Sequence, residues 1–100
     1  MNYIIDLDGT ICNETNFNNR NKSKLIKGAR EAINKLYKKK NNITIYSARG
    51  WNEFKITENW LKKNKVKYHK LILGKAIGDV WIDDRAIKFT NWKSVSKKIK

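Results

Sequence analysis

The segment from Tyr3 to Thr10 constrains this chain most, because an apolar strand pattern ends there in two carboxylates and a glycine. Alternate side chains of a strand share one face, so Asp6 and Asp8 are expected to point the same way from the strand end. Gly9 allows the backbone to turn sharply and to approach a bound group closely. Two neighbouring carboxylates repel each other unless a cation lies between them, and a hard divalent ion is the expected one. The segment therefore predicts a magnesium site.

Short apolar runs alternate with segments of helical spacing along the chain, which favours a parallel sheet covered by helices on both faces. Strands are expected at 2–7, 43–46, 68–73 and 80–82. Helices are expected at 24–39, with Ser23 as its N-cap, from 51 or 52 to 64, and from 91 or 92 to 99. The predicted fold class is α/β, and a chain of 100 residues is expected to form one domain, 1–100.

Nothing in the sequence indicates a membrane or secreted protein. No apolar run approaches the ~20 residues that cross a bilayer, and the N-terminus lacks the pattern of a signal peptide. The single Cys12 cannot form an internal disulfide, which agrees with a reducing compartment. No histidine lies near Cys12 in sequence, so we expect an ordinary small side chain lining the loop after Thr10. The expected location is the cytoplasm, without a membrane partner.

The formal net charge of +14 favours attraction to nucleic acid, an anionic surface or a phosphorylated substrate. Lysine outnumbers arginine nineteen to four, and asparagine and isoleucine are abundant, as AT-rich coding alone would produce. Neither an arginine cluster nor aromatic residues within a basic stripe points to nucleic acid. A phosphorylated small molecule is therefore the preferred partner, and nucleic acid is the second candidate.

Polar side chains follow the expected strands at their carboxyl ends, where ligands bind in open parallel sheets. Besides Asp6 and Asp8, this set contains Ser47, Lys75, Asp83 and Asp84. In phosphoryl transfer one carboxylate attacks phosphorus and a second one moves the proton. A hydroxyl and an ammonium hold the transferred oxygens, and further carboxylates secure the metal. The set therefore predicts a phosphoryl-transfer site.

The order of these residues resembles the haloacid dehalogenase-like (HAD) superfamily of aspartate-nucleophile phosphatases. The matching motifs are DLDGT at 6–10, Ser47 in ITIYSAR, Lys75 in LILGKA and the acidic pair in VWIDDRA. The resemblance extends from Tyr3 to about Arg85 and implies a HAD-like core with a Rossmann-like parallel sheet. It also implies a capless member, because the expected helices and strands already fill 11–46 and 48–74.

The resemblance implies a role for each matching residue. Asp6 would be the nucleophile that forms an aspartyl-phosphate, and Asp8 the general acid and then the general base. Ser47 and Lys75 would hold the phosphoryl oxygens, and Thr10 would support the turn beside the substrate.

The resemblance also implies the ligands of the magnesium ion. These would be Asp6, the backbone carbonyl of Asp8, and Asp83. Asp84 would bind through water or orient Lys75, and which member of the acidic pair binds directly stays open. Arg49, close to Ser47 in sequence, is a candidate second contact for the anion.

The expected function is a magnesium-dependent phosphomonoesterase acting on a sugar phosphate or a related metabolite of surface-polysaccharide synthesis. This substrate class comes from a similarity to small capless HAD proteins of capsule and lipopolysaccharide genes. An alternative is a nucleic-acid 3′-end phosphatase, favoured by the basic charge and an open site. A non-catalytic phosphate-binding or interaction module is an alternative of another class. A capless site is open to solvent, so we expect either a homo-oligomer or a substrate with a large body to cover it.

Overall fold

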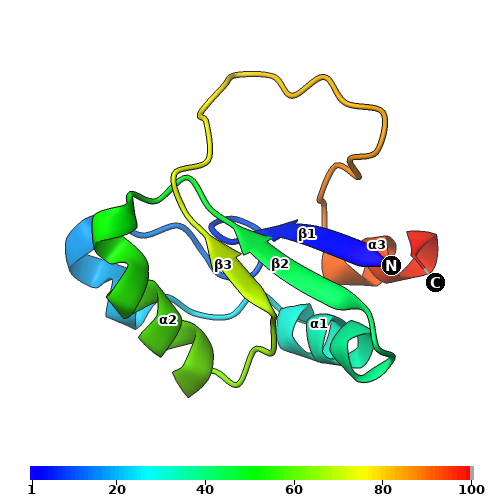
Figure 1. Cartoon of the computed structure of the whole chain (residues 1–100), viewed down its shortest axis with the longest axis horizontal. Coiled ribbons are helices and arrows are strands. Elements are labelled where there is room, and N and C mark those ends of the chain that lie inside the picture. The colour runs from blue at the N-terminus through cyan, green and yellow to red at the C-terminus, as the bar shows by residue number, and fades with distance from the viewer. Residues whose placement is uncertain (100) are drawn as a thin grey trace.

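Three parallel strands form the sheet of this α/β protein, whose computed structural model describes residues 1–99 (Figure 1). They are β1 (Asn2–Asp6), β2 (Asn42–Tyr46) and β3 (Lys70–Ile72), in that order across the sheet. The register pairs Asp6 with Tyr46 and Tyr46 with Ile72. The three strands therefore end side by side, and the segments after them start from one edge of the sheet.

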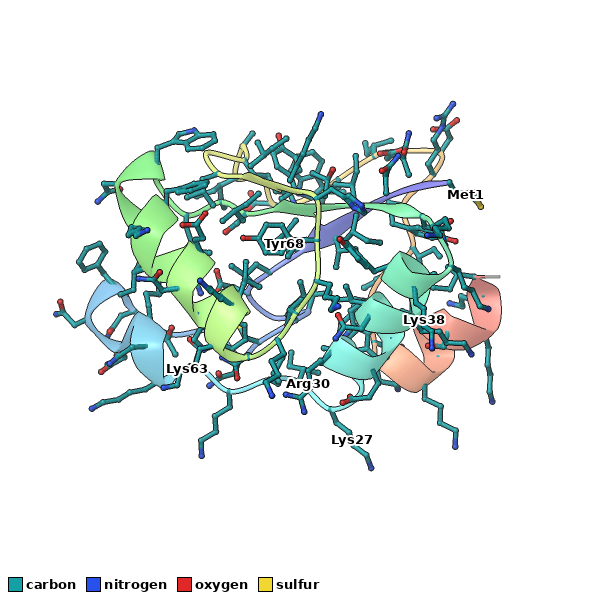
Figure 2. All side chains as sticks on the ribbon, turned by 60° about the horizontal axis from the view of Figure 1, so that its bottom comes forward. Met1, Lys27, Arg30, Lys38, Lys63 and Tyr68 are labelled. Carbon is teal, nitrogen blue, oxygen red and sulfur yellow. The ribbon has the colours of Figure 1, made fainter. Side chains whose placement is uncertain are left out.

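The helices lie on one side of the sheet, and the long segment between the last strand and the last helix arches over the other side (Figures 1 and 2). The α-helices are α1 (Ala29–Lys38), α2 (Phe54–Lys63) and α3 (Trp92–Lys98). Two 3₁₀ helices are η1 (Phe17–Lys22) and η2 (Trp51–Glu53). No helix within residues 1–99 is long and apolar enough to cross a bilayer.

Burial alternates along the strands, as expected for a sheet covered on one face. Ile5, Ile43 and Ile45 are buried on the helical side, where they pack with α1 and α2 residues such as Leu61. On the opposite face Ile4 is 70% exposed. The core therefore lies between the sheet and the helices, and the prediction of helices on both faces is wrong for the described residues.

The lysine-rich helix faces are solvated. Figure 2 shows Lys27, Lys38 and Lys63 extending from the body of the protein, and all three side chains are exposed. The large positive charge is thus carried to a considerable extent by surface on the helical side of the molecule.

Helix α1 begins at Ala29 and not at residue 24, so the prediction of Ser23 as its N-cap is wrong. Gly28 has a φ of 85°, a left-handed conformation that interrupts the helical pattern. The Ser23 hydroxyl shares a hydrogen bond of 2.9 Å with Thr15, and the Ser23 carbonyl accepts one of 2.9 Å from the Trp60 indole. Ser23 therefore ties its loop to α2 instead of starting a helix.

The predicted strand at 80–82 is also absent, and this is the largest difference from the sequence prediction. Val80 is 76% exposed, Ile82 is 96% exposed, and neither pairs with a strand. The side chains of this segment are exposed, so it buries little surface to offset the entropy of ordering it. Within residues 1–99, strand β1 consequently pairs only with β2 and is the edge of the sheet.

The remaining elements agree with the prediction to within a few residues. Strand 68–73 is shortened to β3, and the helix expected at 51–64 is divided into η2 and α2. The last helix begins as expected after Asn91, whose side-chain oxygen accepts a hydrogen bond of 2.8 Å from the Ser94 N–H.

Two alanine substitutions distinguish the observed fold from the predicted one. Leu61→Ala is expected to lower the free energy of unfolding by about 2–5 kcal/mol, because it empties a fully buried site. Ile82→Ala is expected to change it by less than about 0.5 kcal/mol, because the side chain is exposed. Urea denaturation measures both, and a large loss for Ile82→Ala would mean that 80–82 is packed as a strand.

Candidate active site

A cavity of about 290 Å³ opens where the strands end. It is lined on one side by side chains that the sequence predicts as catalytic, and on the other by the segment after Lys75. The lining residues are Asp6, Asp8, Glu14, Ala48, Lys75, Ala76, Ile77, Gly78 and Trp81. The structure thus brings Asp6, Asp8 and Lys75 to one site, as predicted.

Asp6 and Lys75 form an ion pair in this cavity. The Lys75 Nζ lies 3.7 Å from Asp6 Oδ1, and the Lys75 and Asp6 side chains are 21% and 43% exposed. The same ammonium lies 5.5 Å from the centre of the Tyr46 ring and 5.1 Å from that of Trp81. The charge of Lys75 is therefore held beside the carboxylate by two aromatic rings and stays accessible from the cavity.

The turn after β1 presents Asp8 to the same cavity. The N–H groups of Thr10, Ile11 and Cys12 all donate to the Leu7 carbonyl, at 3.1, 2.8 and 3.2 Å. Gly9 has a φ of 84°, which a residue with a side chain would adopt only with strain. Thr10 supports this turn through its backbone, whereas its predicted contact with substrate stays a prediction.

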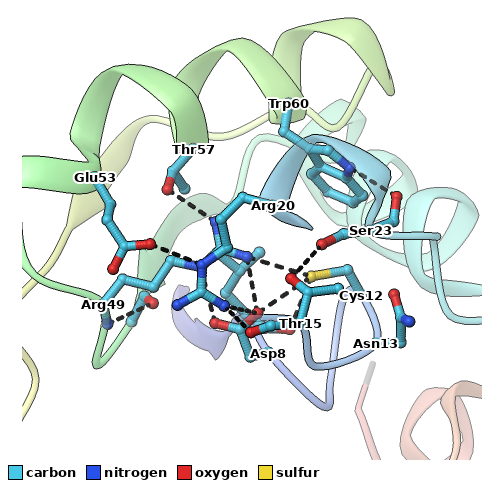
Figure 3. Close-up of polar contacts among 12 residues, drawn as sticks. Asp8, Cys12, Asn13, Thr15, Arg20, Ser23, Arg49, Glu53, Thr57 and Trp60 are labelled. Carbon is cyan, nitrogen blue, oxygen red and sulfur yellow. Dashed lines mark hydrogen bonds and ion pairs between the residues drawn. The ribbon is translucent and has the colours of Figure 1, made fainter. Parts of the chain in front are cut away.

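Arg49 donates two hydrogen bonds to the carboxylate of Asp8 (Figure 3). Its Nε donates to Oδ2 at 2.9 Å and its Nη2 to Oδ1 at 2.8 Å, while Nη1 donates to the Thr57 hydroxyl at 2.9 Å. The Arg49 side chain is only 2% exposed. Arg49 therefore reaches the site through Asp8, as a positioning residue, and does not line the cavity as an anion contact.

Arg20 extends this network from η1 to η2. Its Nη1 lies 3.7 Å from Asp8 Oδ1, and its Nε donates to Glu53 Oε1 at 2.7 Å. Burial acts to lower the pKa of Arg20, but the hydrogen bond to Glu53 and the charge of Asp8 outweigh it and raise that pKa. Two arginines and Glu53 thus fix the orientation of Asp8 (Figure 3).

Ser47 lies next to the site, but its hydroxyl does not line the cavity. The side chain is fully buried, and its oxygen accepts the Arg49 N–H at 3.1 Å. The Ser47 carbonyl accepts the Lys75 N–H at 3.0 Å. Ser47 therefore holds the backbone of two site residues in place, and its contact with a phosphoryl oxygen stays a prediction.

Asp83 and Asp84 are not brought to this site. Asp83 accepts the Arg85 N–H at 2.8 Å, and Asp84 lies 3.9 Å from the exposed Arg85 side chain. The strand that would have carried them to the sheet edge is not formed. Across residues 1–99 no group of three or more His, Cys, Asp or Glu side chains is placed to hold a metal ion. The described residues therefore do not bring Asp83 or Asp84 to Asp6 and Asp8, as the predicted magnesium site requires.

The sequence reasoning missed several residues of the site and its support: Glu14, Arg20, Glu53, Thr57 and Trp81. One signal could have found Arg20. The chain has only four arginines among 23 basic residues. Each one therefore suggests a site that needs the paired hydrogen bonds of a planar guanidinium, which lysine cannot supply. Glu53 carries no such signal, because its partner Arg20 lies 33 residues away in the chain.

Cys12 is a buried free thiol beside Asp8. Burial, together with the smaller effect of the Asp8 charge, raises its pKa from 9.0 to about 12. The thiol is therefore protonated at neutral pH, which agrees with the expectation that Cys12 is not a nucleophile.

Thiol labelling tests the burial of Cys12. At pH 8 a pKa of about 12 instead of 9.0 leaves ~1,000-fold less thiolate, so the folded protein should react with an alkylating reagent far more slowly than in urea. The raised pKa stabilises the folded state below pH 9, and this contribution is lost as the pH rises from 9 towards 12. The stability difference between wild type and Cys12→Ala should shrink over that range. Equal labelling rates with and without urea would contradict the burial.

Arg49→Lys tests the two hydrogen bonds from the Arg49 guanidinium to Asp8. An ammonium cannot reproduce the hydrogen bonds to both carboxylate oxygens and to Thr57, so the free energy of unfolding should fall by about 1–3 kcal/mol. Arg85→Lys is the matched control, since that side chain is 90% exposed, and should change stability by less than about 0.5 kcal/mol. Equal denaturation midpoints for the two variants would mean that the hydrogen bonds from Arg49 to Asp8 contribute nothing to stability.

Comparison with known proteins relates this geometry to solved structures. No family model matches the chain, and no curated protein matches it. A crystal structure from Vibrio cholerae is similar with a TM-score of 0.76 and 24% identity, over 95% of this chain and 86% of that one. A chain of a Pnkp1/Rnl/Hen1 complex is similar with a TM-score of 0.64 and 19% identity, over 83% of this chain and 30% of that one. At these identities the similarity shows a shared α/β fold.

Proposed function

We propose that this protein is a HAD-type phosphomonoesterase, built on a capless HAD-like core, that works through an aspartyl-phosphate at Asp6. The observation that carries the proposal is the ion pair of 3.7 Å between Asp6 and Lys75 inside a cavity at the strand ends. A carboxylate with an accessible oxygen and an ammonium beside it are the nucleophile and the charge-neutralising group that phosphoryl transfer needs.

The reaction has two balanced steps. In the first, an Asp6 oxygen forms a bond to phosphorus, the bond from phosphorus to the ester oxygen breaks, and the leaving oxygen takes a proton from Asp8. In the second, water attacks the phosphorus and gives its proton to Asp8, and the bond to Asp6 breaks. Inorganic phosphate leaves and both carboxyl groups return to their initial states. Lys75 offsets the negative charge on the phosphoryl oxygens in both steps.

The arginine network orients the Asp8 side chain. Proton transfer requires the carboxyl group within hydrogen-bond reach of the leaving oxygen. Arg49 approaches Asp8 from the loop after β2, and Arg20 approaches it from η1, so together they limit the directions in which the carboxyl group can point. Their contribution is to positioning, so we expect Arg49 variants to lower kcat more than they raise KM.

We also propose that activity requires magnesium. Asp6 leaves a partly exposed carboxylate in the cavity, and Glu14 lines the same cavity. Magnesium is commonly bound by only one or two carboxylates together with substrate phosphates, so these two residues would hold it when a phosphate ester is bound.

The substrate class has two candidates. The sequence favours a sugar phosphate or a related metabolite. A nucleic-acid 3′ end is supported by the net charge of +14 and by the cavity at the strand ends. One protein of similar fold belongs to a Pnkp1/Rnl/Hen1 complex, which is consistent with the second candidate. We also propose that the protein is cytoplasmic and that it forms a homo-oligomer in which a second copy of the chain covers the open site.

Turnover of an aryl phosphate tests the proposed function. Wild type should hydrolyse p-nitrophenyl phosphate with Mg²⁺ and lose this activity in EDTA. Asp6→Asn should lower kcat at least ~10³-fold, because an amide cannot replace the nucleophile. Glu58→Gln, on the surface of α2, is the matched control and should retain wild-type activity.

A panel of sugar phosphates, nucleotides and 3′-phosphorylated oligonucleotides extends this assay. Folded wild-type protein without metal-dependent turnover on any member of the panel would overturn the proposal in favour of a phosphate-binding module.

A further inference from the structure

Trp81 is an exposed aromatic side chain that lines the proposed active site. It is 56% exposed, yet it belongs to the wall of the cavity that holds Asp6 and Asp8. The structure leaves residues 80–82 outside the sheet and Trp81 outside the core, so packing in the core does not account for this side chain. The Lys75 ammonium lies 5.1 Å from the centre of its ring. The indole therefore leaves aromatic surface accessible beside the catalytic charges.

Lys75 relates this ring to the reacting atoms. Its ammonium lies 3.7 Å from Asp6 and 5.1 Å from the centre of the Trp81 ring. A phosphate bound between Asp6 and Lys75 would therefore lie close to the indole. The leaving group of a substrate, attached to that phosphate through the ester oxygen, is brought next to Trp81.

The wall around Trp81 indicates what kind of leaving group fits. The neighbouring lining residues are Ala76, Ile77 and Gly78, none of which has a hydrogen-bonding side chain. A sugar would leave its hydroxyl groups without side-chain partners on this wall, which costs free energy. A planar base can instead place its face on the indole without hydrogen bonds. A cavity of about 290 Å³ suits one terminal unit of a ligand, with any longer body outside.

We propose that Trp81 stacks on the base of a nucleotide phosphate monoester whose phosphate lies between Asp6 and Lys75. This inference rests on the proposed function, because it uses the same site, and it makes Trp81 a determinant of specificity. The net charge of +14 favours such an anionic ligand. A free nucleotide and the 3′ end of a single-stranded nucleic acid present the same base and phosphate, and the experiment separates these two sources.

Equilibrium binding tests the inference without turnover. Asp6→Asn protein is titrated with adenosine 3′-monophosphate, ribose 5-phosphate and inorganic phosphate in a calorimeter. Adding Trp81→Ala should weaken binding of the nucleotide about 5- to 150-fold and leave the other two ligands unchanged, because only the base stacks. Trp81→Phe should retain part of the affinity, because it keeps an aromatic face.

Trp51→Ala is the matched control. Trp51 is 57% exposed and packs on Phe54 without lining the cavity, so its removal should leave nucleotide affinity unchanged. Equal losses for Trp51→Ala and Trp81→Ala would overturn the inference, because they would indicate a general loss of surface and not stacking in the site. Unchanged nucleotide affinity in Trp81→Ala would overturn it directly.

The outcomes separate this inference from the proposed function. Trp81-dependent nucleotide binding, together with wild-type protein that shows no turnover, supports the stacking and contradicts the phosphatase. Turnover with no Trp81 dependence supports the phosphatase and contradicts the stacking. A 3′-phosphorylated oligonucleotide that binds more tightly than the nucleotide, with a steep salt dependence, assigns a nucleic-acid end. Equal affinities for the oligonucleotide and the nucleotide would identify a free nucleotide as the ligand.

Discussion

The two hydrogen bonds from Arg49 to Asp8 connect the parts of this protein that the candidate site needs. Asp8 belongs to the turn after β1, and Arg49 belongs to the loop between β2 and α2, which Thr57 of α2 also holds. Both ends of the contact are shielded, so it is stronger than a surface ion pair and costly to break. Without it the turn after β1 would lose two hydrogen bonds to the loop after β2.

The sequence predicted well the features that depend on neighbours along the chain. The strand before Asp6, the turn at Gly9 and the arrival of Lys75 at the same sheet edge follow from local pattern and from the rule for parallel strands. Contacts between distant segments could not be predicted. Arg20 and Glu53 are 33 residues apart, and nothing in the composition of either segment selects the other.

The errors have physical causes of two kinds. Helix α1 starts late because Gly28 takes a left-handed conformation where the apolar spacing alone suggests continuation. Residues 80–82 have strand-like composition but pair with no other strand, so Asp83 and Asp84 stay in solvent and Trp81 becomes part of the cavity wall. A pattern gives the preference of a segment, whereas its length and its neighbours decide whether that preference is realised.

Within residues 1–99 one side of β1 has no neighbouring strand, and this affects how separate molecules meet. An edge strand offers a row of free amide and carbonyl groups to any extended chain, and here Ile4 adds an exposed apolar side chain. Mutual repulsion opposes such contact between two copies, since each carries a net charge of +14. Added salt shortens the range of that repulsion to about 10 Å at 0.1 M. The colloidal behaviour of this protein is thus controlled by ionic strength, with dilute buffers keeping the molecules apart.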